Sequence, residues 1–211
     1  MLFRTLLLLA ASFCAATTFS QSNFDNGMPV TFLSGFPATI GSDGNLPLHI
    51  ADDFVLPGSA STISRIVWHG TQGNRVGDPI PSREFNIEIY GPGVVPSTPH
   101  PIALHTFHNV MPSTTRLGKR ASPRTIGPFV INRYSFQLPS TITLTAGQTY
   151  WICIYAAPDP SVSPVNEFYW SHSTYTGGNT NMRVPPPLPF FVPTLTYLSY
   201  HRGDVSFKLY P

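Results

Sequence analysis

The chain has few residues that could form covalent cross-links and few charged residues. It has 211 residues with 2 cysteines, and charged residues make up 10% of the total. Its clearest apolar run, Leu6–Ala11, is far below the ~18 residues of a membrane-spanning helix, so we expect no membrane span. If Cys14 is removed with a leader, Cys153 has no partner, and the fold is held by packing alone. Its aromatic and aliphatic neighbours predict a buried, inert thiol in a strand.

Residues 1–20 have the order of a secretory signal peptide. One cation, Arg4, precedes the apolar run, and small and hydroxylic residues follow as far as Ser20. Cleavage after Ala16 and cleavage after Ser20 are alternatives. We therefore expect a secreted, extracytoplasmic protein whose mature chain, residues 21–211, is a single domain.

The composition indicates an all-β fold. The chain has 23 prolines, 16 glycines and 13% aromatic residues, which favours sheets joined by many turns. Period-two alternation is clearest in residues 84–90, where Phe85, Ile87 and Ile89 share one face. The same alternation predicts two more sets of inward residues, which are Tyr134, Phe136 and Leu138, and Val205, Phe207 and Leu209. The expected strands are 48–55, 63–69, 84–90, 102–110, 133–138, 149–155, 168–171, 195–200 and 205–210. We predict a two-sheet antiparallel β-sandwich of jelly-roll type.

Six short segments follow one another in an informative order. They are Ala51-Asp52-Asp53-Phe54, Ile66-Val67-Trp68-His69-Gly70, Phe85-Asn86-Ile87-Glu88-Ile89-Tyr90, Leu144-Thr145-Ala146-Gly147-Gln148-Thr149-Tyr150-Trp151-Ile152, Phe168-Tyr169-Trp170-Ser171 and Asp204-Val205-Ser206-Phe207-Lys208-Leu209. In this order they resemble an uncharacterised β-sandwich module of secreted bacterial proteins, many of which carry a C-terminal sorting tail. The resemblance implies the fold and offers no catalytic residues. Because the sequence ends at Tyr210-Pro211 without a hydrophobic, Arg-ended tail, we do not expect anchoring by that route.

Acidic residues are missing from the middle of the chain. None occurs between Glu88 and Asp159, while this stretch contains the cations Arg116, Lys119, Arg120, Arg124 and Arg133. The asymmetry predicts a cationic patch around a loop of residues 116–124, with an acidic or sulfated polysaccharide or another extracellular polyanion as partner. The alternative is a solvated loop without a partner. We expect no nucleic-acid binding, because the chain is exported and lacks a compact basic domain.

Aromatic residues suggest a second kind of contact. Tyr169 and Tyr175 lie beside Ser, Thr and Gly, so we interpret them as candidates for stacking on sugar rings. Trp68 and Trp151 have apolar neighbours, which favours places in the core.

Asp52 and Asp53 are the candidate metal ligands. Carboxylate oxygens suit calcium, and a structural calcium ion is the one cofactor we consider. Adjacent residues of a strand face opposite ways, so the alternative is that one aspartate caps a turn or accepts backbone N–H groups at a strand end.

Signatures of catalysis are lacking: the sequence has no Gly-x-Ser-x-Gly elbow, no His-Glu-x-x-His site and no phosphate-binding glycine loop. The leading interpretation is a secreted, non-catalytic module that binds extracellular glycan or a matrix polyanion. Two alternatives stay open. One is a structural surface or envelope component that associates with itself, and the other is a glycoside hydrolase with an unrecognised pair of carboxylates.

Overall fold

The computed structural model describes residues 22–29, 39–41, 49–58, 60–72, 83–94, 102–120, 129–157, 168–173, 180–183, 199–200 and 204–211. The signal peptide predicted at residues 1–20 lies outside these ranges, as do Arg124 and Tyr175. All regular elements within them are β-strands. The described part of the chain accordingly has no helix that could cross a membrane.

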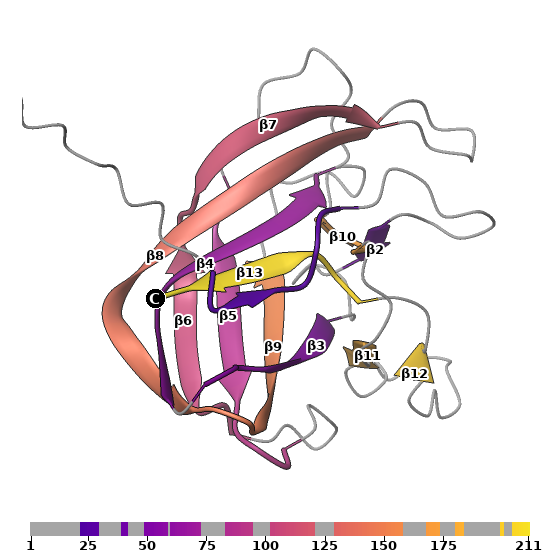
Figure 1. Ribbon diagram of the computed structural model, residues 1–211. Coiled ribbons are helices and arrows are strands. Elements are labelled where there is room, and N and C mark those ends of the chain that lie inside the picture. Colours follow the sequence, from indigo (N-terminus) through magenta and orange to yellow (C-terminus); the bar gives the residue numbers. More distant parts are fainter. Residues whose placement is uncertain are drawn as a thin grey trace, which may run out of the picture.

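The strands form two antiparallel sheets (Figure 1). The seven-stranded sheet contains β1 (Phe24–Asp25), β2 (Thr39–Gly41), β4 (Ala60–Thr71), β7 (Ser113–Arg120), β8 (Phe129–Thr145), β10 (Tyr169–Ser171) and β13 (Phe207–Tyr210). The six-stranded sheet contains β3 (His49–Val55), β5 (Phe85–Tyr90), β6 (His105–Val110), β9 (Thr149–Ala156), β11 (Thr180–Arg183) and β12 (Ser199–Tyr200). The predicted all-β sandwich is confirmed.

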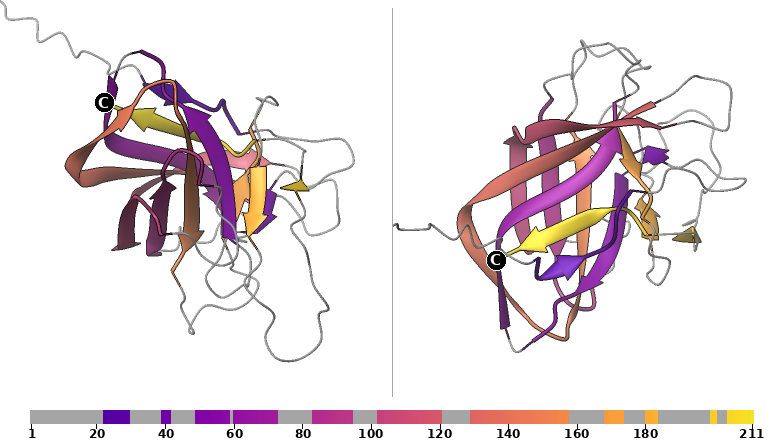
Figure 2. Two further views of the ribbon diagram at one scale, coloured as in Figure 1. Left: turned by 90° about the horizontal axis from the view of Figure 1, so that it is seen from below. Right: turned by 45° about the horizontal axis from the view of Figure 1, so that its top comes forward.

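Most strand pairs join parts of the chain that are distant in sequence. In the seven-stranded sheet, β4 pairs with β8 on one side and with β13 and β10 on the other (Figure 2). In the six-stranded sheet, the order is β12-β11-β3-β9-β5-β6. Chain neighbours such as β3 and β4 therefore lie in different sheets, so the sheets are joined by the connections as well as by packing.

The main core lies between the sheets and is rich in aromatic rings. Trp68 of β4 stacks on Tyr134 of β8 with ring centroids 5.5 Å apart, and Phe85 of β5 meets the ring of Phe168 edge-on at 5.0 Å. The inward faces predicted from period two are correct. Phe136 is partly buried against the core and the other predicted residues are buried, and these are Phe85, Ile87, Ile89, Tyr134, Leu138, Val205, Phe207 and Leu209.

Strand β8 is longer than predicted, because the sequence places a proline where a strand is expected to end. Arg65 pairs with Gln137 and Ile63 pairs with Ile142, so residues 138–141 bulge out opposite a single residue of β4. Pro139 lies in this bulge, where its missing N–H breaks no ladder hydrogen bond. Figure 1 shows β8 running beside β7 and then bending around one side of the sandwich toward β9.

Candidate functional site

The cations predicted to share a loop lie on a strand. Arg116, Lys119 and Arg120 belong to β7, which pairs with β8 along its length, so the expected loop is wrong for residues 116–120. The pattern was missed because β7 contains one large apolar residue, Leu117, and so has no recognisable core-facing side. Arg116 is exposed. Polyanion binding by these cations stays a prediction.

The predicted aromatic contact is distant from these cations. Tyr169 lies in β10, is partly buried and pairs with Thr71 of β4. Strands β4 and β8 separate β10 from β7, which at strand spacing is a distance of about 14 Å. The structure therefore does not bring Tyr169 and Arg116 into one site.

Asp52 and Asp53 also point in different directions. In the register of β3 with β9, Asp52 lies beside Ile152 of the core face, and Asp53 lies beside Trp151 on the other face. Asp52 is fully buried between the sheets, whereas Asp53 is partly exposed. The two carboxylates accordingly do not form one pair of ligands.

The carboxylate of Asp52 joins the two sheets. Its Oδ2 accepts hydrogen bonds from Asn26 Nδ2 at 2.8 Å and from the backbone N–H of Val205 at 2.9 Å. Its Oδ1 accepts the N–H of Asp53 at 3.1 Å. Burial, and then the charge of Asp204, raise the pKa of Asp52. These bonds match the alternative in which an aspartate accepts backbone donors, and we name them the Asp52 latch.

A metal site is not supported by these contacts. Among the residues that the structure describes, no group of three or more His, Cys, Asp or Glu side chains is arranged to hold an ion. The oxygens of Asp52 already accept N–H donors. Calcium binding stays a prediction.

Positive charge gathers instead on the outer face of the seven-stranded sheet. The ladders of β4 place Arg65 beside Gln137 and Tyr210, and His69 beside Arg133. The alternate positions of these strands, such as Trp68 and Tyr134, face the core, so the positions of Arg65, His69 and Arg133 lie on the opposite side of the sheet. We name this surface the cationic face, and it consists of Arg65, Ser113, Thr115, Arg133, Ser135, Gln137 and Lys208.

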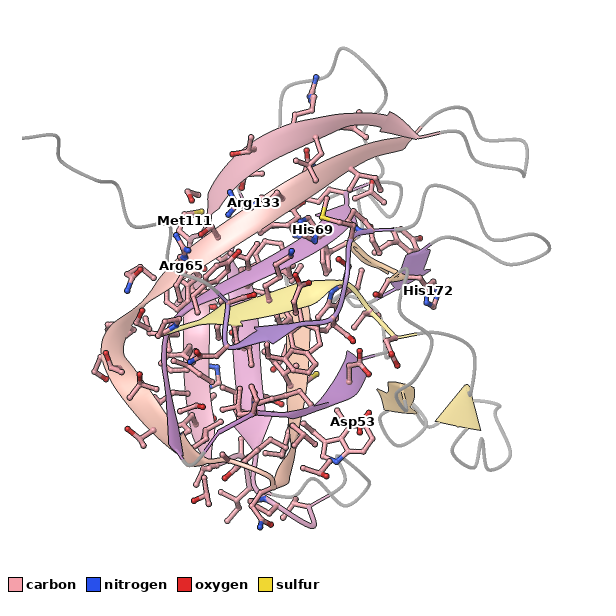
Figure 3. All side chains as sticks on the ribbon, viewed as in Figure 1. Asp53, Arg65, His69, Met111, Arg133 and His172 are labelled. Carbon is pink, nitrogen blue, oxygen red and sulfur yellow. The ribbon has the colours of Figure 1, made fainter. Side chains whose placement is uncertain are left out.

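The two arginines of the cationic face lack an acidic partner among the described residues. Arg65 lies over the ring of Tyr210 at 4.1 Å, and its Nε has no hydrogen-bond partner. The described salt bridge on this side is between Lys208 Nζ and Asp25 Oδ2, at 2.6 Å. Figure 3 labels Arg65 and Arg133 on the adjacent strands β4 and β8. A guanidinium oriented by a ring and not used by a carboxylate can bind an anion through two N–H groups.

A buried histidine–serine pair lies beneath this face. His69 Nδ1 is 2.8 Å from Ser206 Oγ, and Ser206 Oγ donates to the carbonyl of Gly27 at 2.7 Å. A hydroxyl has one proton, so Nδ1 carries the hydrogen and donates to Oγ. Burial, followed by the charges of Arg133 and Lys208, lowers the pKa of His69 to about 4. Both side chains are buried and the hydroxyl is already bonded, so the pair anchors residues 22–29 instead of supplying a nucleophile.

The outer face of the six-stranded sheet has a different composition. Glu88 accepts hydrogen bonds from the hydroxyls of Tyr90 and Tyr155, the latter at 3.0 Å. Burial, and then the charge of Glu88, raise the pKa of Tyr155. Trp151 and Cys153 lie beside them, and we name these five residues the tyrosine–glutamate face. Cys153 is free and fully buried, as predicted, and burial raises its pKa.

This face gives little support to a hydrolase. Asp53 and Glu88 share it on strands separated by β9, with backbones about 10 Å or more apart, and this spacing alone does not rule out a pair of catalytic carboxylates. Both oxygens of Glu88 are used by tyrosine hydroxyls. Trp151 is buried, as predicted, but it belongs to a second cluster on the outer side of the six-stranded sheet. The sequence signal for this second cluster was the lack of alternation in β9, where large apolar side chains occupy both faces of the strand.

Comparisons with known proteins do not extend this description. No family model, no curated protein and no solved structure matches the chain. The resemblance to a module of secreted bacterial proteins accordingly stays a prediction.

Proposed function

We propose that the protein is a secreted, non-catalytic module that binds an anionic extracellular polysaccharide across its cationic face. The observation that carries this proposal is the position of Arg65 and Arg133 on adjacent strands, without a salt bridge to a described acid. A guanidinium group without an acidic partner would be costly to bury inside a protein. At a surface, the same group is suited to binding a sulfate or carboxylate group.

The neighbours of the two arginines support a polysaccharide as the ligand. Thr115 and Ser135 carry hydroxyl groups that can bond sugar hydroxyls. Ser113 Oγ donates to the Ser135 carbonyl and Gln137 Nε2 donates to the Ser64 carbonyl, so these two side chains can offer a ligand their acceptor oxygens. They lie on regular strands, so their spacing is set by the sheet and little ordering is needed on binding. Secretion, as the leader predicts, would bring such a surface to where acidic glycans occur.

The test compares two variants that lose the same charge. Arg65→Ser with Arg133→Ser removes two cations from the cationic face, and Arg116→Ser with Lys119→Ser removes two cations from β7. We expect the first variant to elute from a heparin or alginate column at much lower salt than the wild type, and the second to shift less. Binding by the wild type should weaken as salt rises, because exposed charges are screened.

Circular dichroism and thermal melting serve as the control, since exposed cations contribute little to folding. Wild-type elution of a folded Arg65→Ser, Arg133→Ser variant would overturn the cationic-face proposal. A larger shift of the elution salt in the β7 variant would indicate that the polysaccharide binds the cations predicted from the sequence.

Self-association is a second candidate, and exposed apolar residues favour it. Near the edge strand β6, Ile102, Leu104 and Met111 are 94%, 52% and 54% exposed. Among the described strands, β6 pairs with β5 alone, so no described strand covers its other edge. Concentration-dependent light scattering that Ile102→Asp abolishes, together with no retention on a polysaccharide column, would favour this candidate.

A further inference from the structure

The sequence contains one Asn-Gly pair, Asn26-Gly27, and this pair belongs to the Asp52 latch. Gly27 has a φ of 81°, which favours glycine, so the turn after β1 explains why glycine occurs here. Glycine has no side chain, and it therefore leaves the amide of the preceding asparagine open to attack by the next backbone nitrogen. Asn26-Gly27 is accordingly the pair in this chain most prone to lose its side-chain amide.

The loss of the amide needs water and no enzyme. The nitrogen of Gly27 attacks Cγ of Asn26, the bond between Cγ and Nδ2 breaks, and Nδ2 leaves as ammonia with the proton of the attacking nitrogen. Water then opens the resulting cyclic imide at either carbonyl, which gives aspartate or isoaspartate at position 26. The attack requires that the Asn26 side chain turns toward Gly27 and that the Gly27 N–H loses its proton.

The folded protein holds both reacting groups. Asn26 Nδ2 donates to Oδ2 of Asp52 at 2.8 Å and to the carbonyl of Val205 at 2.9 Å, so both amide hydrogens are used. The N–H of Gly27 donates to Oδ1 of Asp25 at 2.9 Å. Asn26 is also 2% exposed. Its side chain must therefore break both bonds of the latch before it can turn toward the nitrogen of Gly27.

The product of the reaction cannot make the same contacts. An ionised carboxylate at position 26 has acceptors where the amide has donors, and it would face Oδ2 of Asp52 and the carbonyl of Val205. Burial, and then the charge of Asp204, already raise the pKa of Asp52, so a further carboxylate adds a like charge to a buried place. An isoaspartate also lengthens the backbone before Gly27, whose carbonyl accepts Ser206 Oγ. A modified chain therefore cannot close the latch again.

We propose that Asn26-Gly27 is a site of spontaneous deamidation that the Asp52 latch protects, and that the reaction makes opening of residues 22–29 irreversible. Folded proteins open locally at a lower cost in free energy than complete unfolding requires. The fraction of molecules with an open latch then sets the rate at which the amide is lost. This inference rests on the latch and is independent of polysaccharide binding by the cationic face.

The first experiment measures deamidation at position 26 by peptide mapping and mass spectrometry at mildly alkaline pH. Asp52→Asn weakens the latch, because an amide cannot accept N–H groups at both of its ends. Asp53→Asn removes the same charge from the next residue and is the matched control. We expect deamidation at least about tenfold faster in Asp52→Asn than in the wild type, as for loss of a hydrogen bond to a charged group. Asp53→Asn should stay within about twofold of the wild type.

The same measurement in urea gives the rate without a latch. All three chains should then react at one rate, which is faster than that of the folded wild type. A folded wild type that reacts as fast as the chain in urea would overturn protection by the latch. No deamidation at position 26 in urea would overturn the site itself, and a folded Asp52→Asn variant with the wild-type rate would overturn the role of Asp52.

The second experiment introduces the side chain of the product directly. Asn26→Asp should lower the melting temperature much more than Asn23→Asp, which makes the same change at a solvent-exposed hydrogen bond to the carbonyl of Thr62. Equal melting temperatures would show that the latch tolerates the product, and irreversibility would then be wrong. If Asp52→Asn does not fold, the wild-type rates with and without urea and the comparison of Asn26→Asp with Asn23→Asp still decide.

Discussion

The two sheets present outer faces that differ in both charge and burial. The cationic face of the seven-stranded sheet has hydroxyl, amide and guanidinium groups on β7, β8 and β13, whereas the outward residues Val67 and His69 of β4 are themselves buried. On the six-stranded sheet, Trp151 and Tyr155 are 7% and 9% exposed although they face away from the main core. Val94 and Ala103, at the two ends of the connection from β5 to β6, pack against this second cluster.

We infer from this difference that the tyrosine–glutamate face stabilises the fold, whereas the cationic face is the one for which we propose binding. An antiparallel sheet needs one apolar face, and its second face is normally solvated. The exposed residues of the cationic face on β7 and β8 follow this rule, and we propose that its charged groups bind a partner. The tyrosine–glutamate face breaks it, and its carboxylate and hydroxyls are used within the protein. Mutations on the two faces should therefore affect different properties.

Truncation of Trp151 should have the largest effect on stability. Trp151→Ala removes a large ring from the second cluster, and we expect a loss of about 3–5 kcal/mol in the free energy of unfolding. Arg133→Ala on the opposite face is the control, with a change within about 0.5 kcal/mol. Urea unfolding measures both, and similar losses for the two would remove the contrast between the faces.

The next effect is a loss of stability in acid caused by His69. Its pKa is about 4 in the folded protein and 6.5 when unperturbed, so between these values the unfolded chain binds a proton that the folded protein does not. Stability should fall by about 3 kcal/mol as the pH drops from 6.5 to 4. Asp52 acts in the opposite direction, because its raised pKa makes the folded protein bind the proton more tightly.

His69→Asn isolates the histidine, since an Asn amide can still donate to Ser206. Denaturant unfolding from pH 4 to 7 should show a flatter profile for the variant than for the wild type. If the two profiles run parallel, His69 does not titrate with a lowered pKa.

Whether a feature of the fold or the site could be predicted from the sequence depended on how far apart in the chain its residues lie. The inward faces of β5 and of residues 205–209 follow from local alternation, and the burial of Cys153 follows from its neighbours. The Asp52 latch joins residues 26, 52 and 205, and no local pattern pairs them. The cationic face likewise needs the register of β4 with β8, because Arg65 and Arg133 are far apart in sequence.

Removal of one hydroxyl should give a smaller loss on the tyrosine–glutamate face. Tyr155→Phe deletes the donor to Glu88 Oε1 and keeps the ring, so we expect a loss of about 1–2 kcal/mol, larger than for most surface changes. Tyr210→Phe on the other face keeps the ring under Arg65 and should change stability by less than about 0.5 kcal/mol. Equal, small changes in stability for the two variants would mean that a water molecule replaces the lost hydrogen bond to Glu88.

The smallest expected effect connects the cationic face with the histidine below it. The charge of Arg133 is the second cause of the lowered pKa of His69, after burial, so Arg133→Ser should raise this pKa. The shift should be partial, because burial and Lys208 remain. An NMR titration of the His69 ring protons measures it directly. Arg116→Ser on β7 removes the same charge and should change the titration less, since Arg133 pairs directly with His69 whereas Arg116 pairs with Asn132 on the far side of β8. An unchanged titration in Arg133→Ser would mean that this guanidinium lies away from the histidine, extended into solvent where a polyanion would meet it alone.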